Sequence, residues 1–180
     1  MIAGTEAASQ DTRLTSYLQV GVGYDSNINS ATARDSIAVL PSWGNRVFRL
    51  SDDGQKKESG FNEARFNISY STPIAPNWRF LTEANIAATG NWETSDYNTV
   101  VSDLSVGLAR RANTHQFIGR IQGQNYRLGD HTYRNLLGVL GQYSYSVSRD
   151  AEINVFAQGS RLHYPGFTMR NANRSTMGAS

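Results

Sequence analysis

The chain has 180 residues, a length at which a single domain is the usual organisation. Its formal charge is only +2, so it offers no basic surface of the size that indicates nucleic-acid binding. It has no cysteine, which excludes disulfides, thiolate metal sites and a cysteine nucleophile. Apolar residues make up 39% and charged residues 18%, and a chain poor in both suits a sheet whose second face meets water inside a barrel.

Targeting signals are absent from the sequence as it stands. No run of about 18 apolar residues occurs, so no transmembrane helix is expected. Residues 1–10 have neither the basic nor the apolar region of a signal peptide, and we expect any export signal to be missing from this chain. The sequence therefore predicts a polar leader over residues 1–13 and a β-barrel domain over residues 14–180.

The first predicted strand lies within residues 14–29. Apolar residues there alternate with polar residues or glycine, a period of two that predicts a strand with one apolar face. Asp25 and Asn27 follow, and their side chains favour an Asx-turn that ends the strand more readily than a calcium site. The apolar positions are Leu18, Val20, Val22 and Tyr24, and the opposite positions are Gln19, Gly21, Gly23 and Asp25.

A long polar segment over residues 26–60 comes next, and we expect it to be an external loop. A segment this long without regular structure is usually functional or mobile. Its apolar residues Trp43, Phe48 and Leu50 are candidate anchors, either for folding into the barrel as a constriction or for reaching outward to a partner. Val47, Phe48 and Leu50 also suggest a short strand inside the loop.

The same alternation recurs along the rest of the chain, and no helical period longer than two turns is visible. The connections after the first, third, fifth and seventh strands look longer than the others, as in outer-membrane barrels with short periplasmic turns. The expected strands cover residues 62–72, 78–88, 98–109, 116–126, 133–147, 152–164 and, cut short, 176–180.

These features predict an all-β, antiparallel up-and-down transmembrane β-barrel with about eight strands in this chain, part of a larger barrel. Most predicted strands are long enough to cross a bilayer, which takes about 9–11 tilted residues. Tyrosine and tryptophan lie near many strand ends, as interfacial girdles require. A complete eight-stranded barrel is the alternative of the same class. A lipocalin-like barrel or a sandwich remains open as well, because alternation alone does not say which face meets water.

Charged residues on the polar faces of the strands are the candidate functional residues. They are either a charged lumen that guides a passenger or a structural network of ion pairs. No catalytic site is predicted, because neither His131 with Asp130 nor His163 with Ser160 has a third group to complete it. No metal or cofactor site is predicted either, because no metal-ligand spacing and no phosphate-binding glycine loop is present. The lumen candidates are Asp25, Glu63, Arg65, Arg79, Glu83, Asp103, Arg120 and Arg134.

Several short motifs resemble a known bacterial family. Residues 21–32, GVGYDSNINSAT, resemble the opening strand of the surface lipoprotein assembly modifier proteins, outer-membrane β-barrels that often follow periplasmic tetratricopeptide repeats. Residues 73–78, Tyr164-Pro165 and residues 170–174 match the family in style. The resemblance implies a barrel with more strands than this chain has room for, so we expect the chain to be the first part of one.

The resemblance also implies a function, which we state as an expectation. It is translocation or surface display of a protein or polymer, in the outer membrane of a Gram-negative bacterium, and no enzyme activity. The expected partners are outer-membrane lipid, a secreted passenger and a periplasmic repeat domain outside this chain, with no nucleic acid. A passive general porin and a soluble ligand-binding β-barrel are the alternatives.

Overall fold

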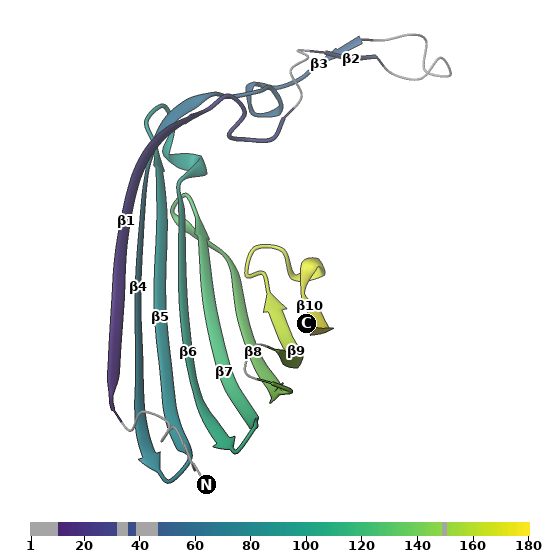
Figure 1. Ribbon diagram of the computed structural model, residues 1–180. Coiled ribbons are helices and arrows are strands. Elements are labelled where there is room, and N and C mark those ends of the chain that lie inside the picture. The colour runs from purple at the N-terminus through teal and green to yellow at the C-terminus, as the bar shows by residue number, and fades with distance from the viewer. Residues whose placement is uncertain (1–10, 32–35, 39–46, 149–150) are drawn as a thin grey trace, which may run out of the picture.

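A computed structural model describes residues 11–31, 36–38, 47–148 and 151–180, and eight of its strands form one antiparallel sheet (Figure 1). A separate pair of three-residue strands, β2 (Ser36–Ala38) and β3 (Val47–Arg49), lies beyond one end of the sheet (Figure 1). The eight strands of this sheet lie side by side in chain order. In order these are β1 (Arg13–Asp25), β4 (Ser59–Ala75), β5 (Trp78–Asn91), β6 (Thr99–Ala112), β7 (His115–Leu128), β8 (His131–Ser146), β9 (Glu152–His163) and β10 (Ala172–Ala179).

The alternation in the sequence becomes two chemically different faces. Because partners in register lie on the same side of a sheet, the pairing carries one apolar face from β1 to β10. Side chains on this face are exposed: Leu18 is 70% exposed, Val22 77% and Ile121 62%. Among the described residues, only Ala109 and Leu162 are buried hydrophobic side chains. No protein core therefore covers the apolar face.

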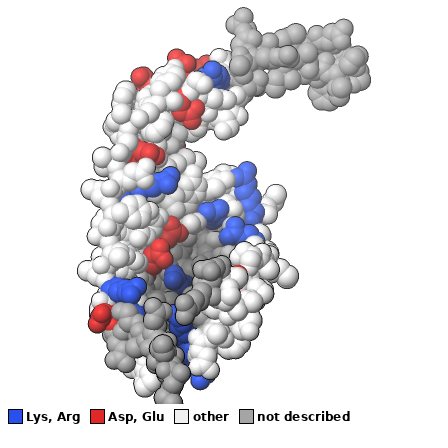
Figure 2. Space-filling model, viewed as in Figure 1, with Lys and Arg blue, Asp and Glu red and all other residues white. Residues whose placement is uncertain are grey.

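The sheet is curved, and its polar face is the concave one (Figure 2). Curvature crowds side chains on the inside of a sheet and spreads them on the outside. A Cβ added at Gly107, on the polar face, would lie 2.3 Å from the carbonyl oxygen of Gly119. A Cβ added at Gly90 or Gly141, on the apolar face, would have nothing within 4 Å. The apolar face is therefore the convex one.

The predicted all-β, antiparallel, up-and-down architecture is confirmed. Helical segments in the described part of the chain are single 3-10 turns at Asp52–Gly54, Ser95–Tyr97 and Thr168–Arg170. The sheet is open: β1 and β10 are its two edges and are not paired with each other (Figure 1). The structure therefore shows an open sheet and not a closed barrel.

The predicted length of one connection and the predicted start of the last strand were wrong. The connection after β7 is only two residues, Gly129 and Asp130, because Gly129 has a φ of +56°, in the region that tight hairpin turns require. The last strand begins at Ala172 instead of Thr176, since Ala172 already pairs with Leu162. The polar residues before Thr176 read as a loop, but the register with β9 holds them in the sheet.

Hydrogen bonds of backbone and amide groups join the two ends of the long first loop. Asn27 donates its backbone N–H to the Asp25 carboxylate at 2.8 Å, which confirms the Asx-turn at the end of β1. Asn29 accepts from the backbone N–H of Lys57 at 3.0 Å and donates to the carbonyl of Gln55 at 2.6 Å. These bonds join the two ends of the loop just beyond β1 and β4.

Candidate functional site

The concave face of the sheet is the candidate site, because charged side chains from successive strands gather there (Figure 2). The register aligns Asn67 on β4 with Asn85 on β5, Asn85 with Asp103 on β6, and Asp103 with Gln124 on β7. Counting in steps of two along each strand from this row gives the other members of the face. The eight candidates Asp25, Glu63, Arg65, Arg79, Glu83, Asp103, Arg120 and Arg134 all have this phase.

The first cluster on this face is centred on an ion pair across three strands. A guanidinium nitrogen of Arg120 on β7 lies 3.1 Å from the Glu83 carboxylate on β5. Asn67 donates to the other oxygen of Glu83 at 3.1 Å, and Arg120 also donates to Ser105 at 3.5 Å. The Arg120 and Glu83 side chains are 27% and 43% exposed, so they remain accessible to water and ions.

The second cluster is centred on Asp103 of β6. Its two carboxylate oxygens accept hydrogen bonds from Asn85 at 3.2 Å and from Gln124 at 2.7 Å. Gln124 in turn accepts from Arg134 at 2.6 Å, and the Arg134 guanidinium lies 5.7 Å from the centre of the Tyr126 ring. An acid and a base are therefore connected through an amide side chain.

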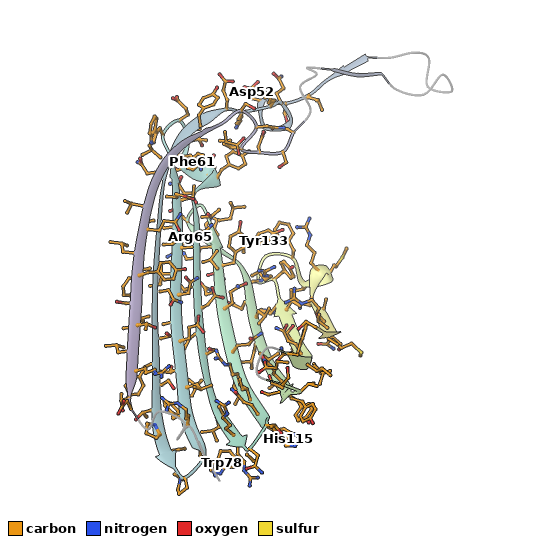
Figure 3. The ribbon with its side chains drawn as sticks, in the orientation of Figure 1. Asp52, Phe61, Arg65, Trp78, His115 and Tyr133 are labelled. Carbon is orange, nitrogen blue, oxygen red and sulfur yellow. The ribbon has the colours of Figure 1, made fainter. Side chains whose placement is uncertain are left out.

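The remaining candidates lie outside these two clusters. Arg79 donates to the hydroxyl of Ser71 at 2.9 Å and to the backbone carbonyl of Asp11 at 2.9 Å, near the start of β1. Glu63 lies over Gly21 of the neighbouring strand, where an added Cβ would be 2.9 Å from its carboxylate. Asp25 accepts a backbone N–H in its turn, and Arg65 points to the concave side (Figure 3).

The structure adds polar partners that the selection of charged residues had left out. The sequence signal that could have found them is the alternation itself, because they fall on the same polar positions as the charged residues. Nothing in the sequence, however, says which amide lies opposite which carboxylate. These partners are Asn67, Ser71, Asn85, Ser105 and Gln124.

The structure describes only two of the three candidate anchors of the long first loop. Trp43 lies outside the described residues. Phe48 belongs to β3, so the predicted short strand is present, and the carbonyl of Leu50 accepts a hydrogen bond from Gln55 at 3.2 Å. Leu50 thereby helps to fold the turn that leads back to β4.

Tyrosines at the long-loop end of the sheet are not all in an outward girdle. Tyr126 is on the concave face by register with Arg134. It packs edge-on against Tyr133, with ring centres 5.6 Å apart, and Tyr133 packs edge-on against Tyr164. Tyr126 therefore lies on the polar side of the sheet and not in an outward girdle.

The described residues hold no group of three or more His, Asp or Glu side chains that could bind a metal ion. Within that same part of the chain, no helix is long and apolar enough to cross a membrane.

The fold and this face define a class: an antiparallel up-and-down sheet that exposes apolar side chains on its convex side and lines its concave side with charged and amide groups. The chain belongs to the surface lipoprotein assembly modifier family, whose sequence model matches residues 15–180. The family is linked to the assembly of surface lipoproteins, which associates this chain in general terms with the bacterial cell surface. Searches among curated proteins and solved structures found no match.

Proposed function

We propose that this chain is part of an outer-membrane β-barrel that moves a protein or polymer to the surface of a Gram-negative bacterium, or displays it there. The observation that carries the proposal is the inverted placement of its two faces. A soluble barrel needs an apolar interior, but here the concave face is polar and the convex face exposes Leu18, Val22 and Ile121. Lipid is the solvent that suits such an outer face.

Strand length agrees with a membrane wall. A transmembrane β-strand takes about 9–11 residues at the usual tilt. Seven strands of the sheet have at least the 12 residues of β9, and β4 has 17. The proposal includes closure of the sheet, either with further strands or by joining β1 to β10, because open edges do not occur in lipid. A periplasmic repeat domain outside this chain is the proposed partner on the inner side.

The concave face then lines an aqueous path. Its carboxylates and guanidinium groups are held by neighbouring side chains in two clusters, around Glu83 and around Asp103. A wall of this kind offers exchangeable hydrogen bonds to an extended passenger without binding it tightly. The proposal assigns the chain no catalytic step.

The test is a comparison of surface proteins in cells with and without the natural full-length protein. Intact cells are shaved with protease, and the released peptides and the total protein are both quantified by mass spectrometry. We expect at least one lipoprotein to lose surface exposure in the deletion strain while its total amount remains, and plasmid-borne protein to restore it. An unchanged surface profile would count against translocation.

A passive porin is the second candidate, favoured by the partly exposed Glu83–Arg120 pair on the concave face. A porin would give stable conductance in planar bilayers at high salt, and reversing the charge at Arg120 would change its ion selectivity. A translocator with a closed or occupied lumen would give little steady conductance. The two experiments together separate the candidates.

A further inference from the structure

The convex face has an open groove across β7, β8 and β9. Gly119 pairs directly with Gly141, and Gly141 with Ala157, so these three residues form its floor. A Cβ added at Gly119 or Gly141 would have nothing within 4 Å. The space is one part of an open depression of about 1640 Å³ whose lining runs from Trp78 on β5 to Ala179 on β10. We call the part of it over Gly119, Gly141 and Ala157 the Gly119 groove.

Larger apolar side chains wall the Gly119 groove on both sides. Ile121 and Val139 pair with each other on the side towards the long loops. Phe117 and Tyr143 pair on the side towards the short turns. Phe117 and Ile121 are four residues apart, about 13 Å along the strand. Ile121 is 62% exposed and Val139 58%, so no described part of the chain fills the groove.

Polar groups gather where the groove wall meets the short-turn end of the sheet. Arg110 lies beside Phe117 in register, and its guanidinium is 5.5 Å from the centre of the Trp78 ring. His115 is 2.8 Å from the Tyr143 hydroxyl, and Figure 3 shows Trp78 and His115 at this same end. Aromatic rings beside a cation are typical of a water–hydrocarbon boundary, where the cation faces anionic headgroups.

The charge at this boundary favours one kind of occupant. Within the described residues no carboxylate forms an ion pair with Arg110, which is exposed on the apolar face. An amphiphile with an anionic head and an apolar chain would match both Arg110 and the groove behind it. Outer-membrane barrels place their short turns at the periplasmic side. The leaflet on that side is built from phospholipid.

We propose that the Gly119 groove holds one phospholipid of the periplasmic leaflet, with its phosphate at Arg110 and an acyl chain over Gly119 and Gly141. The proposal rests on the membrane-wall function above, since only a lipid-facing sheet meets such a molecule. It goes further by making one lipid a specific ligand. When the groove is empty, the atoms that line it have no dispersion partners on its open side. An acyl chain in the groove would supply such partners to its floor and both walls.

The experiment measures lipid retained by the natural full-length protein after purification in mild detergent, using native mass spectrometry. A Gly119→Leu/Gly141→Leu variant fills the groove, and Arg110→Gln removes the charge. Two matched controls change the same residue types elsewhere. Gly90→Leu alters another open glycine on the convex face, and Arg127→Gln alters an arginine at the opposite end of β7.

We expect the wild-type protein and both controls to retain one phospholipid. Arg110→Gln should lower the retained fraction about fivefold, the effect of one cation near a lipid surface. The double leucine variant should lose the bound lipid. Equal retention in all proteins, or loss in the controls as well, would overturn the proposal. Retention of a lipopolysaccharide or of a lipoprotein acyl chain in place of phospholipid would also overturn it.

Migration on gels before and after boiling separates this result from the function itself. A wild-type protein that fractionates with the outer membrane and shifts on boiling, but carries no lipid, would overturn the lipid site alone. A protein that does neither would overturn the membrane wall and the lipid site together. If the double leucine variant does not fold, as loss of the heat shift would reveal, Arg110→Gln decides the outcome.

Discussion

At the scale of single residues, the concave face satisfies its charges mainly with amide and hydroxyl groups. The ion pair between Glu83 and Arg120 has an N–O distance of 3.1 Å. With both side chains partly exposed, such a pair contributes little to stability. Asp103 instead accepts from two amides, Asn85 and Gln124. We therefore expect the polar wall to tolerate water beside these hydrogen bonds.

Replacing Asp103 tests whether that wall is wet. In Asp103→Ala, Asn85 and Gln124 lose their acceptor, and water replaces it if the lumen is aqueous. We expect the free energy of unfolding in lipid vesicles, measured with urea, to fall by about 1 kcal/mol or less. Asp103→Asn, which keeps one carbonyl acceptor, is the matched control. A loss above about 3 kcal/mol would indicate a dry, packed interior instead of an aqueous one.

At this scale the sequence predicts the face but not the partners. Period two is enough to assign Glu83, Asp103 and Arg120 to the polar side, because adjacent residues in a strand point to opposite faces. The hydrogen bond from Gln124 to Asp103 depends on the register between β6 and β7. The ion pair of Arg120 with Glu83 depends on the registers of both β5 with β6 and β6 with β7. Those registers follow from turns, whose geometry a single sequence indicates poorly.

At the scale of the strands, curvature controls which substitutions the sheet accepts. Gly107 on β6 lies on the crowded concave side, under Arg120 of β7. Gly90 on β5 lies on the open convex side. The seven longer strands were predicted in the right order and number, but the sheet extends beyond several predicted ends. Ser59 and Asn91 both belong to strands, although serine and asparagine are residue types common in loops.

Gly107→Ala and Gly90→Ala test the curvature directly. The first places a Cβ against the backbone carbonyl of Gly119, and overpacking of this kind costs about 1–3 kcal/mol. The second enters open space and should change stability by less than about 1 kcal/mol. Urea unfolding of both variants of the full-length protein in lipid vesicles measures the difference. Equal effects of the two substitutions would contradict a polar concave face.

At the scale of the whole molecule, the exposed apolar face and the open edges demand an environment that the chain itself does not provide. Apolar side chains this exposed on many strands need lipid or another protein surface. The unpaired backbone groups along β1 and β10 need hydrogen-bond partners, which further strands or pairing of β1 with β10 would supply. The sequence predicts the strands well, but whether and with what the sheet closes depends on contacts beyond these residues.

Cell fractionation of the natural full-length protein is the corresponding prediction. We expect it in the outer-membrane fraction, migrating faster on gels before boiling than after, because a closed hydrogen-bonded barrel resists detergent until it is heated. Known periplasmic and outer-membrane proteins in the same fractions are the controls. A soluble product whose migration does not change on boiling would contradict the membrane wall. It would indicate that the apolar face is buried inside a soluble protein.

The order of the strands has a consequence for how the sheet forms. From β4 to β10 every strand pairs with its neighbours in the chain, so these contacts are local in sequence, and each added hairpin closes a short loop. The pairing of β1 with β4 must instead close a loop over residues 26–58, with the largest chain-entropy cost in the sheet. The bonds of Asn29 to Gln55 and Lys57 offset part of that cost. Among the pairings of this sheet, that of β1 with β4 therefore depends most on its connecting loop, and the hydrogen bonds at the loop base help to hold it.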